Sequence, residues 1–279
     1  MRLDEILNDG SGVYFEGTLI DALQTPFQLI EVFDTPSLGK LMRIDGANMT
    51  SEADEFFYHE SLVHPAAIAH PAPRNVLIIG GGDGGSSEEV LKHPSVERVV
   101  LAELDPGVIK LAKKHLLSVH RNVFANPKLE VRIGDGAAVV KSTTAHFDLI
   151  YMDLTDPIGP ASALYSQAFY ADWKRALDFG GALVLHIGSP FSHPDRVVSS
   201  LAHLRAVFAH VAPYFVPIPT YGGMWGLVVA AETLDPREIS SADVNQRLHD
   251  RGITDRQLYN GDTHQAMLAL PEYIKTLIG

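Results

Sequence analysis

The chain has 279 residues, of which 46% are hydrophobic and 20% are charged, a balance typical of a globular protein of one or two domains. It contains no cysteine, which excludes disulfide bonds, thiolate nucleophiles and every cysteine-ligated metal site. Its formal net charge of −12 disfavours binding to nucleic-acid phosphates and favours cationic partners.

The first segment of the chain is rich in aromatic and β-branched residues. Residues 12–19, 27–33 and 41–46 predict three strands with turn-forming residues between them. We therefore expect a small antiparallel β domain over residues 1–53. Residues 55–69 have apolar side chains at helical spacing, with a kink expected at Pro65, and two prolines end this helix at residues 71 and 73.

From residue 74 onward the chain alternates between strand and helix patterns. Predicted strands cover residues 76–79, 99–103, 129–133, 147–153, 182–187, 214–218 and 224–230, and predicted helices cover 86–93, 108–117, 167–177 and 195–208. This rhythm predicts an α/β fold over residues 54–279, with a Rossmann-like, doubly wound and mostly parallel sheet. Ligands of such sheets bind at the carboxyl ends of the strands, so each strand-to-helix loop is a candidate site.

A glycine-rich loop follows the first strand of this sheet. Gly80, Gly82 and Gly85 match the G-x-G-x-x-G pattern, and Glu103 ends the next strand, which is the context of a nucleotide-binding turn; a tight turn without a ligand is the alternative. Asp83 lies inside the loop, where its carboxylate would repel the pyrophosphate of a dinucleotide. A nucleoside with a cationic tail, such as S-adenosylmethionine and its relatives, fits better, and Glu103 can accept both ribose hydroxyls.

Two further strands end in carboxylates. Asp135 follows the third strand, where it can accept a hydrogen bond from an adenine amino group or simply serve in a turn. Asp153 and Asp156 follow the fourth strand, before Pro157; either could cap a helix. Together with Asp83 they could bind a metal ion, but without a phosphate ligand we favour an organic dication such as a diamine, and no metal.

The remaining patterns exclude other classes. His59 and His64 are five residues apart, which points them away from each other on a helix and rules out a zinc-protease motif. Acidic residues stand where a signal peptide would be basic, and the longest apolar run, residues 224–231, is far shorter than the ~20 residues of a membrane helix. We expect a cytoplasmic protein without a membrane or nucleic-acid partner.

These patterns together resemble the spermidine synthase family of polyamine aminopropyltransferases. The matching segments are residues 25–28, 54–60, 76–85, 103–105, 134–136, 153–160, 218–221, 259–260, 264 and 268–271. The resemblance implies a small N-terminal β domain and a Rossmann-like, methyltransferase-type domain, assembled as a homodimer or homotetramer. It implies transfer of an aminopropyl group from decarboxylated S-adenosylmethionine to an amine, typically putrescine, giving spermidine and methylthioadenosine without a cofactor.

The resemblance also implies roles for individual residues. The donor nucleoside would be held by Gln28, Glu103, Asp135, Gly136 and Pro160, and the donor's aminopropyl amine by Asp83. The amine channel would be lined by Tyr58, His59, Asp83, Asp153, Asp156 and Tyr221, with Trp225 near it, and Asp153 would be the catalytic base.

Two positions depart from the family pattern, and three other functions compete. Glu88 stands where the family usually has arginine, and His186 where it usually has glutamine; the first could alter packing, the second the choice of acceptor. The alternatives are an S-adenosylmethionine-dependent amine N-methyltransferase, a non-catalytic polyamine- or nucleoside-binding protein, and an NAD-dependent oxidoreductase. Asp83 argues against the first and the last, because it would repel a carboxylate or a phosphate.

Overall fold

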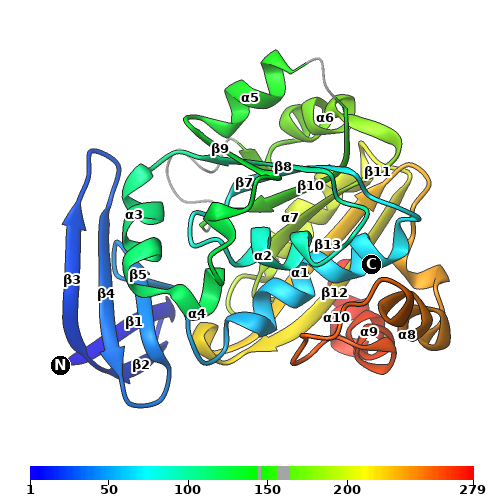
Figure 1. The fold of residues 1–279 in the computed structure, drawn as a ribbon. Helices are drawn as coiled ribbons and strands as arrows, with labels where there is room; N and C mark the ends of the chain where they lie inside the picture. The colour runs from blue at the N-terminus through cyan, green and yellow to red at the C-terminus, as the bar shows by residue number, and fades with distance from the viewer. Residues whose placement is uncertain (144–145, 156–163) are drawn as a thin grey trace.

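The N-terminal segment forms two small antiparallel sheets at one end of the molecule (Figure 1). The computed structural model describes residues 1–143, 146–155 and 164–279. A two-stranded sheet contains β1 (Arg2–Asn8) and β2 (Ser11–Glu16), and a four-stranded sheet contains β3 (Thr18–Gln24), β4 (Leu29–Thr35), β5 (Gly39–Ile44) and β6 (Ala47–Ser51).

The sequence prediction for this segment is right about its antiparallel sheets, but it misses β1 and β6 and merges two strands into one. Residues 12–19 are not a single strand, because β2 ends at Glu16 and β3 begins at Thr18. The chain changes partner between them: β2 pairs with β1, whereas β3 pairs with β4. The pattern of alternating side chains continues across this switch, so it could not reveal where one sheet ends and the next begins.

The larger part of the molecule is built on a seven-stranded sheet in the order β12-β13-β11-β10-β7-β8-β9. Its strands are β7 (Asn75–Gly80), β8 (Arg98–Glu103), β9 (Leu129–Ile133), β10 (Phe147–Asp153), β11 (Leu177–Gly188), β12 (His210–Ile218) and β13 (Gly223–Ala231). The five strands from β11 to β9 run parallel, and β13 pairs antiparallel with β11 and β12. The predicted doubly wound, mostly parallel α/β sheet is confirmed.

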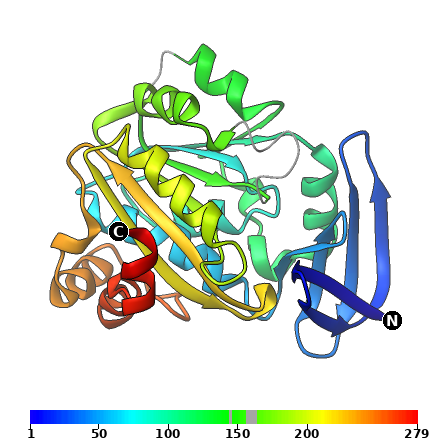
Figure 2. The same ribbon diagram turned by 180° about the vertical axis from the view of Figure 1, so that it is seen from behind.

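Helices cover both faces of this sheet (Figures 1 and 2). The helices of this part are α1 (Glu55–Ala69), α2 (Gly85–Leu91), α3 (Pro106–His115), α4 (Leu117–His120), α5 (Gly136–Ser142), α6 (Gln167–Ala176), α7 (Pro194–Arg205), α8 (Ser241–Asp250), α9 (Gly261–Leu268) and α10 (Glu272–Ile278), with 3₁₀ turns at Val123–Ala125, Pro219–Tyr221 and Pro236–Glu238. The bounds predicted for α1 are confirmed, and its helix continues through Pro65.

The two faces of the sheet form separate hydrophobic cores. Along β7, Val76 and Ile78 pack with residues of α1 on one face of the sheet. Leu77 and Ile79 pack on the other face, with residues of α6 and α7. All four side chains are buried, as an uninterrupted apolar run in a central parallel strand predicts. Both faces of β7 are therefore covered, and this strand lies between the two cores.

Helix α3 joins the N-terminal sheets to the larger part. Ile30, Val32 and Met42 of the four-stranded sheet pack against Val108 and Leu111 of α3. Polar contacts add to this packing: Asp105 caps α3 by accepting from the backbone N–H of Gly107 at 2.8 Å, and also accepts from Thr25 Oγ1 at 2.7 Å. The β3–β4 turn is thereby fixed over the end of β8.

Candidate active site

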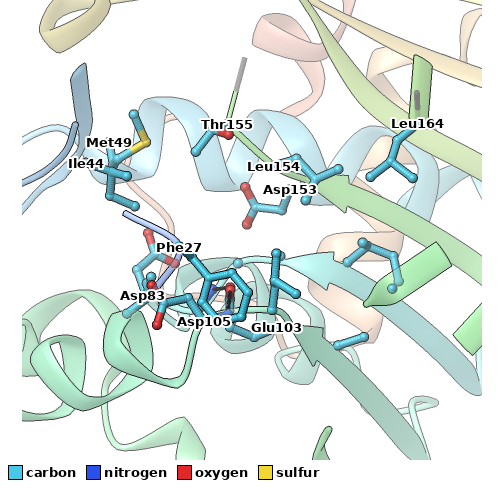
Figure 3. Close-up of a pocket in the computed structure, with 18 of the residues that line it drawn as sticks. Phe27, Ile44, Met49, Asp83, Glu103, Asp105, Asp153, Leu154, Thr155 and Leu164 are labelled. Atoms are coloured by element: carbon cyan, nitrogen blue, oxygen red, sulfur yellow. Dashed lines mark hydrogen bonds between the residues drawn. The ribbon is translucent and has the colours of Figure 1, made fainter. Parts of the chain in front are cut away.

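A cavity of about 540 Å³ lies at the carboxyl ends of β7, β8 and β10. The N-terminal sheet closes one side of it through Gln28, Met42, Ile44 and Met49. Figure 3 shows Asp153 and Leu154 at the end of their strand, with Phe27, Asp105 and Glu103 across from them. The polar lining is mainly acidic, with the carboxyl groups of Asp83, Glu103, Asp105, Asp135 and Asp153 beside the two basic side chains His59 and Lys141.

The glycine loop between β7 and α2 forms the floor of this cavity. Gly80 has a φ of +78°, and a methyl group there would overlap the carbonyl oxygen of Asp153. That oxygen accepts a 2.8 Å hydrogen bond from the backbone N–H of Gly81. The loop thus crosses directly over the end of β10, which glycine permits because it has no side chain and tolerates positive φ.

Glu103 is held from below by the backbone on both of its oxygens. Oε1 accepts from the N–H of Asp105 at 2.8 Å and Oε2 from the N–H of Gly82 at 3.1 Å. Burial, opposed by these hydrogen bonds and reinforced by nearby carboxylates, raises the pKa of Glu103 to about 7. The carboxyl group is therefore fixed in orientation at the wall of the cavity, as a ligand for two adjacent hydroxyls requires.

The other residues expected at the nucleoside line the same cavity. Gln28 reaches it from the β3–β4 turn, where its N–H donates to Thr25 Oγ1 at 3.1 Å. Asp135 and Gly136 reach it from the end of β9. Asp135 also caps α5 by accepting from the N–H of Ala137 at 2.9 Å, so the turn role and a place in the cavity are compatible. Pro160 lies outside the described residues.

Three ionisable groups from separate segments meet at the centre of the cavity. His59 on α1, Asp83 in the glycine loop and Asp153 on β10 each offer an atom within 4.8 Å of the others. His59 Nε2 is 3.4 Å from Asp83 Oδ2, and its Nδ1 is 2.7 Å from Glu55 Oε2. A ring held by carboxylates at both nitrogens is an imidazolium with no lone pair for a metal ion, so this arrangement favours organic cations over a metal.

The pKa values of Asp83 and Asp153 are shifted in opposite directions. Burial raises the pKa of Asp153 to about 6, and the charge of Asp83 adds to the rise. Burial also acts on Asp83, but the charge and hydrogen bond of His59 outweigh it, so the pKa of Asp83 is lowered. Such a separation is typical of a site where one carboxylate stays charged while the other exchanges a proton.

Aromatic side chains border the acidic centre on the side of α1. Tyr58 lines the cavity with Asp153, and burial and the charge of Asp153 raise the pKa of its hydroxyl. Its ring lies edge-on to that of Tyr221, with centroids 5.9 Å apart. The hydroxyl of Tyr221 donates to the carbonyl of Met49 at 2.7 Å. Trp225 lies behind Tyr221, with ring centroids 4.9 Å apart, and does not line the cavity. Asp156 lies outside the described residues.

The two departures from the family pattern have partners in the fold. Glu88 Oε2 is 3.1 Å from Lys92 Nζ and its Oε1 is 3.4 Å from Arg121 Nη1, whereas burial and the neighbouring Glu89 raise the pKa of Glu88 to about 7. His186 hydrogen-bonds through Nε2 to the carbonyl of Leu154 at 2.9 Å and stacks on Trp225. His186 therefore contacts the backbone next to Asp153 and the aromatic group behind Tyr221.

Several lining residues had no counterpart among the predicted site residues. Met42, Ile44 and Met49 come from the N-terminal sheet, whereas Lys141, Leu164 and Phe169 come from α5 and the region of α6. Lys141 Nζ lies 5.0 Å from the centroid of the Phe169 ring. No motif marks these residues, because they reach the cavity only through packing between elements that are distant in the sequence.

Comparisons with known proteins agree with this geometry. A family profile described as spermine/spermidine synthase domain matches residues 55–240. The chain is 46% identical over 275 residues to a polyamine aminopropyltransferase of Nitrosomonas europaea, covering 98% of this chain and 85% of that one. It is 39% identical to polyamine aminopropyltransferase 1 of Pseudomonas aeruginosa, covering 99% and 96%.

Solved structures resemble the whole chain. A spermidine synthase in complex with the transition-state analogue AdoDATO superposes with a TM-score of 0.94 at 34% identity, covering 100% of this chain and 95% of that chain. Spermidine synthase of Thermotoga maritima superposes with a TM-score of 0.90 at 33% identity, covering 100% and 94%. The resemblance therefore includes the N-terminal sheets as well as the larger sheet.

Proposed function

Because the chain belongs to the spermine/spermidine synthase family and is a polyamine aminopropyltransferase, we propose that its acceptor is putrescine and that its cavity holds the two substrates side by side. The enzyme transfers an aminopropyl group from decarboxylated S-adenosylmethionine to an amine. One observation supports placing both substrates in this cavity: its glycine loop carries the carboxylate of Asp83, which would repel a phosphate and attract a cation.

Adenosine recognition is assigned to the wall at β8 and β9. The fixed carboxyl group of Glu103 would accept the ribose hydroxyls, and Asp135 the adenine amino group, with Gln28 and Gly136 beside them. Asp83, with its lowered pKa, would hold the donor's aminopropyl ammonium. This carboxylate also disfavours intact S-adenosylmethionine, whose own carboxylate would lie close to it.

The acceptor side is assigned to Asp153, Tyr58 and Tyr221. The acceptor nitrogen is protonated near neutral pH, since its pKa is close to the value of about 10.4 for lysine. Asp153 would take that proton, and Tyr58 would orient the nitrogen. The nitrogen lone pair then forms a bond to the carbon beside the sulfonium, the carbon–sulfur bond breaks, and its electron pair stays on sulfur as the thioether of methylthioadenosine.

Positioning is the largest contribution that this arrangement can make. Holding two substrates in line converts a bimolecular step into a unimolecular one, and the sulfonium is already an activated leaving group. The reaction is therefore proposed to need no resident cofactor or metal. Asp156 and Pro160 keep their expected roles in amine and nucleoside binding as proposals.

Assembly and location are proposals as well. Within the described residues no helix is both long and apolar enough to cross a membrane. The homodimer or homotetramer implied by the family resemblance stays a proposal. Light scattering after gel filtration measures that state. A cytoplasmic location is expected from the sequence.

The assay that tests this function uses two donors and a panel of amines, with products identified by mass. We expect decarboxylated S-adenosylmethionine and putrescine to give spermidine and methylthioadenosine. The rate of aminopropyl transfer to putrescine should exceed the rates of transfer to cadaverine, agmatine and spermidine. A methylated amine formed from intact S-adenosylmethionine would instead support the N-methyltransferase alternative. Faster transfer to another amine would overturn putrescine as the acceptor.

A further inference from the structure

The ring of His59 is held between two carboxylates of different segments. Its Nδ1 is 2.7 Å from Oε2 of Glu55, one helical turn earlier on α1, and its Nε2 is 3.4 Å from Oδ2 of Asp83. The side chains of His59 and Glu55 are only 2% and 5% exposed. Nδ1 is therefore hydrogen-bonded to Glu55, and Nε2 forms an ion pair with Asp83.

The ring is also held on its face by the glycine loop. A methyl group on Gly85 would overlap the atoms of the His59 ring, so the backbone of the loop lies directly against it. The ring is therefore confined between α1 and the glycine loop. Its contact with Asp83 then depends on the hydrogen bond at the opposite nitrogen, because a ring that lost Glu55 could turn or lose its proton there.

Charge gives Glu55 a second effect. Glu55, Asp83 and Asp153 are three carboxylates around one imidazolium, so the cluster attracts a cationic ligand. Without Glu55 one of these negative charges is lost, and an ammonium group placed at Asp83 would meet a less negative site. In a buried site such a difference is large, since the effective dielectric constant is well below that of water.

We propose that Glu55 is a positioning residue for the donor. By holding the His59 ring in place, Glu55 keeps Asp83 oriented and ionised, so that this carboxylate can bind the donor's aminopropyl ammonium. This inference rests on the proposed function, which places that ammonium at Asp83. His59 thereby serves Asp83 rather than binding the acceptor amine, which is the role that the family resemblance implied for it.

The surroundings of the ring support a charged state. The titratable groups facing it are Glu55 on α1, Asp83 in the glycine loop, Asp153 on β10 and the neighbouring Tyr58. Arg121 approaches Glu55 from the far side, at 4.0 Å. Burial lowers the pKa of His59, but the charges and hydrogen bonds of Asp83 and Glu55 outweigh this and raise the pKa well above its ordinary value.

The first test compares two ligands that differ at the aminopropyl group. Glu55→Gln retains the shape of the side chain and removes its charge. We expect calorimetric titration at pH 7 to show decarboxylated S-adenosylmethionine bound roughly tenfold or more weakly, the scale of one charge-assisted hydrogen bond. Methylthioadenosine, which has no aminopropyl ammonium, should bind within about twofold of wild type. Equal weakening of both ligands, or of neither, would overturn the inference.

The second readout is pH dependence, which a purely structural role would not change. In the wild-type enzyme the charges of Asp83 and Glu55 raise the pKa of His59 well above its ordinary value, so the charge of His59 should change little above neutral pH. In Glu55→Gln one of these charges is gone while burial still lowers the pKa of His59, so the ring should lose its proton at a lower pH than in the wild type and leave the site more negative. Donor affinity should therefore rise with pH in the variant, and a flat profile in the variant contradicts the proposal.

A double-mutant cycle tests whether Glu55 acts through His59. In a His59→Gln background there is no imidazolium to hold in place, so adding Glu55→Gln should weaken donor binding clearly less than it does in the wild-type background. An undiminished effect of Glu55→Gln in that background would show that Glu55 acts by another route.

A matched control is available on the same helix. Glu60 is equally buried, but it accepts from the backbone N–H groups of residues 257–259. Glu60→Gln should lower thermal stability and leave the affinity for both ligands unchanged. If Glu55→Gln does not fold, Glu55→Asp replaces it: a shorter carboxylate should weaken only the decarboxylated donor, and weakening of both ligands would overturn the inference. Failure of wild-type enzyme to bind that donor would count against the proposed function instead.

Discussion

The hydroxyl of Ser86 donates a 2.6 Å hydrogen bond to Oδ2 of Asp153. Ser86 lies at the start of α2, and Asp153 ends β10, so the glycine loop and the fourth parallel strand are joined at the proposed base. One oxygen of the carboxylate is thereby fixed by the protein. The side chain is held in one orientation before the substrates bind, as efficient proton removal requires.

The first prediction concerns Asp153 as the base. Asp153→Asn retains the size of the side chain and removes its ability to take a proton. We expect kcat to fall by roughly 10²–10⁴-fold, the usual contribution of a general base, with donor affinity changed less than about threefold. Asp148→Asn is the matched control, because Asp148 lies on the same strand but does not line the cavity; it accepts from the N–H groups of residues 74 and 75 and pairs with His70 at 3.8 Å. Near-normal turnover in Asp153→Asn excludes it as the base.

The second prediction concerns pH. The pKa of Asp153 is raised by burial and by Asp83 to about 6, and only the ionised form can accept the proton. The value of kcat/KM should therefore fall as the pH is lowered through about 6. Above that pH it should rise further toward alkaline pH, as more of the free amine becomes deprotonated. A stopped-time assay from pH 5 to pH 9 measures this profile. An activity that increases toward acid would contradict the assignment.

The third prediction concerns the choice of donor. Asp83 should make decarboxylated S-adenosylmethionine bind much more tightly than the intact, carboxylated form, because two like charges a few ångströms apart repel strongly at low dielectric. Asp83→Asn should reduce this preference by about tenfold or more. Titration of both ligands into both proteins gives the ratio. Equal affinity of the wild-type enzyme for the two donors would refute the role of Asp83.

The fourth prediction concerns the route of the amine to the site. A net charge of −12 and an acidic cavity should steer a dication inward. Raising the salt concentration should lower kcat/KM for the amine severalfold, since exposed charges are screened over ~10 Å at about 0.1 M salt. The value of kcat at saturating amine should change little. Salt-independent kcat/KM values would exclude steering and leave the chemistry unaffected.

The fifth prediction concerns stability at Glu88. Replacing it with the arginine usual in the family would place a guanidinium beside Lys92 and Arg121, which now pair with the carboxylate at 3.1 and 3.4 Å. We expect Glu88→Arg to reduce the free energy of unfolding by about 1–3 kcal/mol. Combining it with Arg121→Glu should restore part of the loss. Urea denaturation measures both, and an unchanged midpoint in Glu88→Arg would show that these pairs contribute nothing.

Much of the fold was predictable because its signals are local. The apolar run of β7, the glycine loop and the bounds of α1 follow from periodicity and from residues that stop or permit particular backbone conformations. The break between β2 and β3 at residue 17 was not predictable, because alternating side chains continue across it. Strands β1 and β6 and helices α5, α8, α9 and α10 were also missed.

The proposed site shows the same division. The sequence alone determined which segments bear carboxylates at strand ends, and its spacing of four residues already places Glu55 and His59 on one face of a helix. Only the tertiary structure decided that this helix lies against the glycine loop, so that His59 meets Asp83, that Ser86 meets Asp153, and that Trp225 lies behind Tyr221. Periodicity reports which side a residue faces, whereas the partner it meets there depends on how separate elements pack.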